Sequence, residues 1–216
     1  WITSPVSKKK ISYSISIVDK LDTLTGFFLI NEKPTSSKDP FALRRAAIGL
    51  LRTIIENNLT IKLGDLISYS IKLLGEQGLK TKNSSTEKEI LFFLKERMRN
   101  ILKEKKIRND IIEASISSHT GDNFLDLFRK SILMNKYINK ESGKNAISSY
   151  KRASNIIEKT ENNITGRPDA VLFRQVEEKV LFEKINEVRK AFTVKEEDKN
   201  YENLLIKLSE TKQITD

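Results

Sequence analysis

Two carboxylates, Asp19 and Asp22, lie three positions apart in the segment VDKLDTL. On a helix this spacing places both side chains on the same side, one turn apart. It is the one acidic pair in the chain that suggests a metal site. A single aspartate cannot hold a catalytic metal, and no histidine or cysteine lies nearby to complete a ligand set. The residues alone therefore favour a structural role for this pair.

Other residue types that support catalysis are scarce. The chain has one histidine, His119 in a polar turn, and no cysteine, which excludes disulfides, thiolate nucleophiles and zinc–sulfur sites. A lone histidine in a loop is expected to be solvated. Neither a P-loop nor a G-x-G-x-x-G pattern is present, which argues against a nucleotide cradle of either kind. We therefore expect no catalytic residue, no resident metal and no cofactor within these 216 residues.

A predicted helix over residues 86–105 carries a basic stripe with one aromatic ring in it. Its apolar positions, Ile90, Leu91, Leu94, Met98, Ile101 and Leu102, are expected to face the core. The opposite side presents Lys88, Lys95, Arg99, Lys103 and Lys106, with Phe92 among them. Such a surface could follow phosphates while the ring stacks on a base. The alternative is that Phe92 packs on a neighbouring helix.

A second basic surface is predicted on the helix over residues 144–160. Its polar side carries Lys144, Ser148, Lys151, Arg152, Asn155 and Lys159. Its other side carries Ala146, Ile147, Tyr150, Ala153 and Ile157. Lysine and arginine would contact phosphates, and Asn155 could hydrogen-bond a base edge. An ordinary solvated face is the alternative.

Composition agrees with a polyanionic partner but does not require one. The formal net charge is +10, which favours tRNA as the partner and, as a second choice, an acidic protein or a membrane surface. The alternative is that the organism's proteins are rich in lysine in general, which gives the same excess of positive charge. No apolar run approaches the roughly 20 residues that a membrane span needs, so we expect no membrane association and a cytoplasmic location. The chain begins at Trp1, and we expect it to be an excised fragment.

The periodicity predicts an all-α fold, a helical bundle in two consecutive subdomains. No segment alternates apolar and polar residues as a strand would. The polar run at 80–85 is the expected linker between the subdomains. The predicted helices cover residues 6–26, 39–56, 63–74, 86–105, 108–117, 123–140, 144–160, 169–192 and 200–212.

The segment DPFALRRAAIGLLRTIIE, residues 39–56, has the most distinctive pattern. Asp39 is expected to cap the helix, with Pro40 at its first position. Arg44 falls on the apolar flank and therefore needs a carboxylate or carbonyl partner. Gly49 costs about 1 kcal/mol relative to alanine within a helix, which suggests that another backbone, or RNA, comes close. We expect both residues to dock this part of the chain on its neighbours.

Four segments carry a family resemblance. They are VDKLDTLTGFF (18–28), DPFALRRAAIGLLR (39–52), FFLKERMRNILKEKKIRNDIIEASI (92–116) and IEKTENNITGRPDAVLFRQVEEKVLFEKI (157–185). A shorter one, YKRASNII (150–157), matches the pattern NKR-x-x-NI at Lys151, Arg152, Asn155 and Ile156, with Tyr150 in place of the usual Asn. Together they resemble the β subunit of bacterial glycyl-tRNA synthetase over nearly the whole chain.

The resemblance implies a helical protein that works with a partner subunit. Residues 1–82 would be the end of an HD-like helical domain, and residues 83–216 an anticodon-binding domain that lacks its last helices and leaves an apolar groove exposed. The enzyme of this family is a heterotetramer of two α and two β subunits. Its α subunit carries the class II active site, with glycine, ATP and magnesium, and its β subunit recognises tRNA(Gly). The chain is thus expected to contribute to glycine–tRNA ligase activity in protein biosynthesis without being catalytic alone.

Two other classes of protein stay open. VDKLDTL is also similar to the last metal-ligand motif of HD-type phosphohydrolases, with Asp19 in the ligand position. A metal-dependent phosphohydrolase would have its histidine ligands upstream of Trp1; in their absence Asp19 is a remnant of such a ligand. The third class is a helical interaction scaffold, which would bind polyanions without a steep salt dependence.

Overall fold

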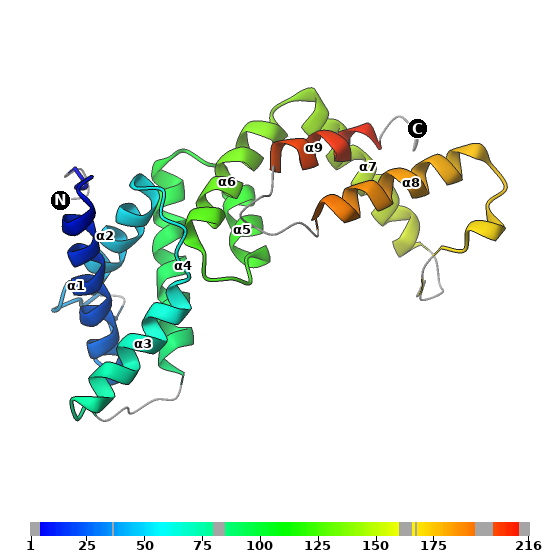
Figure 1. Ribbon diagram of the computed structural model, residues 1–216. Coiled ribbons are helices and arrows are strands. Elements are labelled where there is room, and N and C mark those ends of the chain that lie inside the picture. The colour runs from blue at the N-terminus through cyan, green and yellow to red at the C-terminus, as the bar shows by residue number, and fades with distance from the viewer. Residues whose placement is uncertain are drawn as a thin grey trace. The chain divides into compact units, whose positions relative to one another are not determined.

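The computed structural model describes residues 5–35, 37–79, 85–159, 166, 168–192 and 201–211. Within these residues the chain is helical and contains no strand, so the predicted all-α class is confirmed (Figure 1). The elements are α1 (Lys10–Leu29), α2 (Leu43–Glu56), α3 (Leu63–Glu76), α4 (Thr86–Glu104), α5 (Asn109–Ser118), α6 (Phe124–Ile138), α7 (Glu141–Glu158), η1 (Ala170–Leu172), α8 (Val176–Phe192) and α9 (Tyr201–Glu210).

The predicted helices agree with these elements except at a few ends. Helices α1 and α2 each begin four residues later than predicted, and the predicted helix 169–192 divides into η1 and α8. Helix α7 begins at Glu141, so Gly143 lies inside the helix and does not precede it. The predicted linker at 80–85 falls almost entirely outside the described residues, since only Ser85 is described there.

The ends of the first four helices have a common local cause. Each is followed by a residue with positive φ: Asn31 after α1, Asn58 after α2, Gly78 after α3 and Lys106 after α4. In each case that residue and the next donate backbone N–H groups to the last turn, as in Glu32 N to Phe27 O at 2.8 Å. This pair of bonds is the Schellman motif, which favours glycine or asparagine at the left-handed position. Gly78 thus ends α3, whereas Gly75 lies within the helix.

Asp39 caps α2 as predicted, but from further away. Its two carboxylate oxygens accept hydrogen bonds from the backbone N–H groups of Leu43 (2.8 Å) and Arg44 (3.1 Å). The residue that immediately precedes the helix is Ala42, in a left-handed conformation, so Pro40 lies outside the first helical turn. The carboxylate therefore satisfies two of the four unpaired donors at the start of α2 and adds favourable charge there.

The described chain forms two compact units, unit 1 (Trp1–Ile132) and unit 2 (Leu133–Asp216), with the division inside α6. In unit 1, α1 packs on α2, α3 and α4, and α4 packs on α2, α3 and α5. Its core is aliphatic and closely packed. The fully buried side chains include Leu24, Leu43, Leu50, Leu51, Ile54, Leu63, Ile67, Ile90, Leu94, Met98 and Phe124. The inward face predicted for α4 is confirmed, with Leu91 only half-buried.

The apolar spacing of the first helix predicts a core face of Ile11, Ile15, Val18, Leu21 and Leu24, of which the structure buries only the last two. The buried positions are Ile17, Leu21, Leu24 and Phe28, whereas Ile11, Ile15 and Val18 are exposed. Both sets have helical spacing, and each would form an apolar stripe. The prediction was wrong for the first half of the helix because periodicity alone does not choose between two adjacent stripes.

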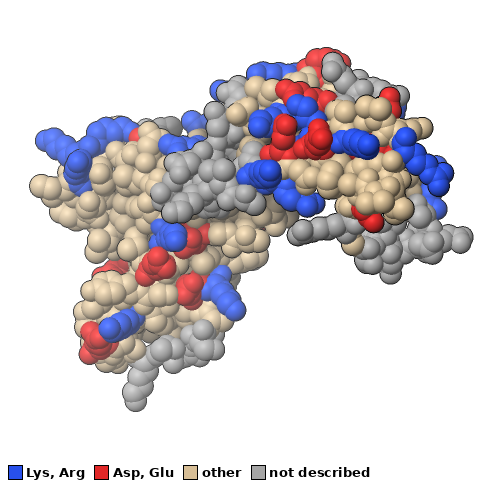
Figure 2. All heavy atoms as spheres, turned by 45° about the vertical axis from the view of Figure 1, so that its right-hand side comes forward, with Lys and Arg blue, Asp and Glu red and all other residues tan. Residues whose placement is uncertain are grey.

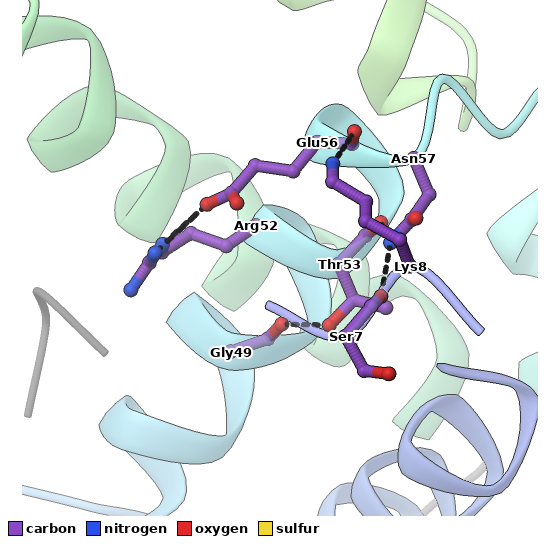
Figure 3. A network of polar contacts seen from close by, with 7 residues as sticks. All are labelled: Ser7, Lys8, Gly49, Arg52, Thr53, Glu56 and Asn57. Carbon is purple, nitrogen blue, oxygen red and sulfur yellow. Dashed lines mark hydrogen bonds and ion pairs between the residues drawn. The ribbon is translucent and has the colours of Figure 1, made fainter. Parts of the chain in front are cut away.

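The amino-terminal segment is tied to the end of α2 (Figure 3). The ammonium group of Lys8 donates to the carbonyl of Glu56, and Asn57 donates to the carbonyl of Ser7 at 3.2 Å. A cation on the last carbonyls of a helix is favourable because those groups lack partners within the helix. The segment before α1 therefore supplies part of the carboxyl-terminal cap of α2.

Gly49 of α2 accommodates a side chain of α1 rather than another part of the backbone. A methyl group on Gly49 would lie 2.9 Å from Cε of Lys20. The carbonyl of Gly49 also accepts the hydroxyl of Thr53 at 2.7 Å (Figure 3). Arg44 has the partner that its position required, because its guanidinium donates to the carbonyl of Thr35. Both residues thus act in packing within unit 1, as expected, although the group close to Gly49 is a side chain and not another backbone.

Unit 2 has a thinner core. Helix α9 packs on α7 and α8, and the buried side chains are Tyr137, Val188 and Leu204. The hydroxyl of Tyr137 donates to the carbonyl of Leu205, which fixes α9 on the end of α6. An apolar groove of about 430 Å³ is lined by side chains of α6, α7, α8 and α9, among them Tyr137, Ile147, Leu181 and Leu205.

The two compact units do not coincide with the two predicted segments. The predicted boundary at 82/83 falls among residues 80–84, outside the described part of the chain. Helices α4 and α5, predicted to open the second segment, pack within unit 1. The assignment of residues 83–216 to an anticodon-binding domain stays a prediction.

Candidate nucleic-acid interface

Two cations of the basic stripe predicted on α4 are occupied by contacts within the protein. Lys95 donates to the carbonyl of His119 at 2.6 Å. Arg99 binds both carboxylate oxygens of Glu113 through Nε at 2.8 Å and Nη2 at 2.9 Å, and it also binds Glu96. The hydrogen bond with Glu113 is the largest cause that raises the pKa of Arg99. The same bond lowers the pKa of the Glu113 carboxyl. These two cations hold α4 to α5 and the loop after it, so they are poorly placed for phosphates.

His119 is buried rather than solvated. Its side chain is 7% exposed and lies against Phe124, with ring centroids 6.3 Å apart. The loop that follows α5 is bound to α4 through the carbonyl of His119 and to the start of α3 through Asp122, which accepts the N–H of Gly64 at 2.8 Å, so a turn that is polar in the sequence is covered in the structure. The prediction of a solvated histidine was wrong.

Phe92 and Lys103 remain on the surface of α4. The Phe92 side chain is 66% exposed, so the core-packing alternative does not describe it. Lys103 is also exposed, and its charge contributes to the lowered pKa of Glu113. Lys88 and Lys106 are exposed as well, so the structure leaves four of the six residues of the predicted stripe accessible to a ligand.

The candidates on α7 form a continuous exposed row. Lys144, Ser148, Lys151 and Asn155 follow each other at spacings of four, three and four residues, which places them on one side of the helix. All four are exposed, as is Arg152 beside them. Lys144 lies 3.9 Å from Glu141, a long ion pair at the surface. An exposed row of cations and one amide can follow a phosphate backbone and read a base.

The opposite side of α7 is only partly covered. Ala146 and Ile147 line the apolar groove of unit 2 and are half-buried. Tyr150 also lines the groove but is 73% exposed, and Ile157 is exposed as well. The second half of the helix therefore carries accessible apolar and basic groups together.

Charge is distributed over both units rather than concentrated at one place. On the face that Figure 2 shows, lysine and arginine side chains gather at several separate places among the acidic ones. The net charge of +10 therefore does not by itself locate a binding surface.

The acidic pair near the amino-terminal end has no ligand geometry. Asp19 is exposed, and its nearest described cation is Lys20 at 4.0 Å. Asp22 accepts a hydrogen bond from the Ser70 hydroxyl at 2.9 Å, which connects α1 to α3. Across the described ranges, no group of three or more His, Asp or Glu side chains is arranged to hold a metal ion. For Asp22 the structure gives a packing role.

One feature of unit 1 was missed by sequence reasoning. A cavity of about 530 Å³ is lined by Phe28, Phe92 and Phe93 together with Lys33, Lys88 and Glu89. Lys33 comes from the loop after α1 and forms an ion pair with Glu89 of α4 at 2.6 Å. The residues lie about 60 positions apart, so nothing in the local pattern could have grouped them.

The fold defines an all-α protein whose described residues carry an exposed basic row on α7 and contain no group of side chains arranged to hold a metal ion. Among the described helices, none has the length and apolar character to cross a membrane. Residues 2–117 match a family model described as glycyl-tRNA synthetase beta subunit. Because the match covers more than half of the chain, the protein belongs to that family.

Individual relatives agree with the family match. The glycine–tRNA ligase beta subunit of Rickettsia felis is 37% identical over 195 residues, covering 90% of this chain and 27% of the relative. That of Glaesserella parasuis is 33% identical over 209 residues, covering 97% of this chain and 30% of the relative. That of a Ruegeria species is 33% identical over 156 residues, covering 72% and 21% respectively. The chain thus spans between about a fifth and a third of the curated relatives it matches.

Proposed function

We propose that this chain is the part of a glycyl-tRNA synthetase β subunit that contacts tRNA(Gly), with α7 as the contact for the anticodon stem-loop. The proposal includes the enzymatic context: a glycine–tRNA ligase of two α and two β subunits that supports protein biosynthesis in the cytoplasm. In it, glycine, ATP and magnesium bind to the α subunit. The family match supports this context over a metal-dependent phosphohydrolase.

The observation that carries the proposal is the exposed polar row of α7. Lys144 and Lys151 lie on one side of the helix with Asn155, and Arg152 is adjacent. Lysine and arginine at this spacing would neutralise successive phosphates, which provides affinity without sequence preference. The Asn155 amide has both a donor and an acceptor, so it can read the edge of an unpaired base. The two kinds of contact predict two separable effects on binding.

The test is a salt series with transcripts of tRNA(Gly) and of a non-cognate tRNA. The double variant Lys151→Glu/Arg152→Glu should weaken binding of both tRNAs and reduce the slope of log K against log[salt] by about 1–2. Asn155→Ala should reduce the preference for tRNA(Gly) and leave the slope unchanged.

The matched control is Lys62→Glu/Lys72→Glu, which changes the net charge by the same amount at exposed lysines on α3 and at its start. It should bind tRNA nearly as the wild type does. Equal losses in the two double variants would show that only overall charge matters, and the assignment of α7 would fail. Absence of a steep salt dependence in the wild type would favour the scaffold interpretation instead.

A further inference from the structure

The cavity of unit 1 combines apolar rings with positive charge. It opens beside α4 and is bounded by the end of α1 and by the loop that contains Lys33. Phe28 forms its buried wall, 3% exposed, with the Phe93 ring 5.4 Å away at an angle of 55°. Its volume of about 530 Å³ lies within the range usual for pockets that hold small organic groups.

Phe92 is the unusual member of this cavity. Its ring is 66% exposed, although it lies next to three other apolar or aromatic lining residues. An exposed phenyl ring at the mouth of an apolar pocket gains free energy when another flat apolar group covers it. Within the described part of the chain, neighbouring groups cover the Phe92 ring less than they cover the rings of Phe28 and Phe93.

Positive charge borders the same rings. Lys88 lines the cavity and is exposed, with no ion pair among the described residues. Behind Phe93, the guanidinium of Arg97 lies 5.1 Å from the ring centroid, and its buried Nε has no hydrogen-bond partner. Burial is the largest cause that lowers the pKa of Arg97, and the like charge of Arg44 adds to it.

Taken together, these features match the chemistry of a nucleotide. We propose that the cavity takes one unpaired base of single-stranded RNA, which stacks on Phe92 while Lys88 contacts the adjoining phosphate. This inference rests on the proposed binding of tRNA and adds a second contact, on unit 1, independent of α7. Base stacking on an aromatic side chain is tolerant of sequence, so the site would strengthen binding without selecting the tRNA.

A tryptophan at position 92 provides a direct reporter of stacking. The sequence contains one tryptophan, Trp1, so the 216-residue chain with Trp1→Phe and Phe92→Trp has a single indole. Titration with the hexanucleotide rA₆ should quench its fluorescence with a saturable dependence. The matched control is Tyr69→Trp in the same Trp1→Phe background, because Tyr69 is 60% exposed on α3 and does not line the cavity. Quenching at position 92 without quenching at position 69 supports the proposal, and equal quenching at both positions would overturn it.

Affinity measurements on the otherwise unchanged chain give the magnitude. Phe92→Ala should weaken binding of rA₆ by roughly 5- to 150-fold, with no change in the salt slope. Lys88→Ala should reduce the slope by about 0.7, the contribution of one phosphate contact on a single strand. Tyr69→Ala should bind as the wild type does. An unchanged affinity of Phe92→Ala, in a protein with wild-type helical content, would overturn the proposal.

The two proposals fail in different ways. If α7 does not bind tRNA, Lys151→Glu/Arg152→Glu will behave as its charge-matched control while Phe92→Ala still weakens rA₆. If the cavity is instead a protein-docking site, Phe92→Ala will leave rA₆ and tRNA binding unchanged, whereas the α7 variant still weakens tRNA binding.

Discussion

Gly143 is the residue on which the position of α7 depends most directly. It is the third residue of the helix and is buried against the end of α6. A methyl group added there would lie 2.2 Å from the carbonyl oxygen of Tyr137 and 2.8 Å from Cα of Ile138. These are backbone atoms, which cannot rotate away as the end of a side chain can. Gly143→Ala should therefore separate α7 from α6.

The expected cost follows from these distances. Carbon atoms in contact normally lie about 3.5–4.0 Å apart, so the backbone must move by about 1 Å or more. Overpacking of this kind costs about 1–3 kcal/mol, and a rigid backbone neighbour places Gly143→Ala near the upper end. Alanine recovers at most about 1 kcal/mol through its better helix propensity. We expect a net destabilisation of unit 2 of roughly 2 kcal/mol.

Gly75→Ala is the matched control, because a methyl group on Gly75 would meet no atom within 4 Å. This substitution near the end of α3 should be neutral or stabilise unit 1 by up to about 1 kcal/mol. The same Gly→Ala change is thus predicted to lower the free energy of unfolding at Gly143 and not to lower it at Gly75.

Hydrogen exchange measured peptide by peptide provides the assay, because it reports each unit separately. In Gly143→Ala, protection should fall in α7, α8 and α9 and remain at the wild-type level in α1 to α4. The variant should also bind tRNA less tightly, since α7 carries the proposed contacts. Wild-type protection in unit 2 of Gly143→Ala would refute the close approach on which this reasoning rests.

Two further predictions concern single interactions. Asp39→Ala removes the acceptor of two backbone hydrogen bonds at the start of α2 and should destabilise unit 1 by about 1 kcal/mol in urea unfolding. Asp39→Asn should recover part of this loss. Equal stability of Asp39→Ala and the wild type would contradict the capping role. Lys184 of α8 binds Glu210 of α9 at 2.8 Å, and this bond lowers the pKa of Glu210 below its ordinary 4.5 and raises that of Lys184 above 10.5. The ion pair stabilises the folded unit 2 at pH values between these two ordinary pKa values. This stabilisation is lost as the pH falls through the lowered pKa of Glu210 or rises through the raised pKa of Lys184. The amides of α9 should therefore be better protected from hydrogen exchange in the wild type than in Lys184→Gln at pH 7, and this difference should vanish in strong acid. A difference that persists in strong acid would assign the effect to packing.

The sequence alone determined the class of fold and most helix ends, because both depend on local interactions. Helical periodicity is a property of about 10–18 neighbouring residues, and the left-handed positions Asn31, Asn58 and Gly78 end helices through bonds within one turn. The family could also be recognised from the sequence, since long segments such as residues 39–52 retain both residue types and spacing. The exposed cations of α7 were predicted correctly as a surface, whereas their role stays a prediction.

The tertiary structure decided everything that depends on which distant residues meet. Two apolar stripes are possible in the first half of α1, and only packing against α2 and α3 selects Ile17 over Ile11, Ile15 and Val18. Lys95 and Arg99 resemble free phosphate ligands in the sequence. In the structure Lys95 binds the carbonyl of His119, 24 residues away, and Arg99 binds Glu113, 14 residues away. The cavity beside Phe92 joins residues from a loop and two helices for the same reason. Burial and charge pairing are properties of the assembled chain, and local pattern does not contain them.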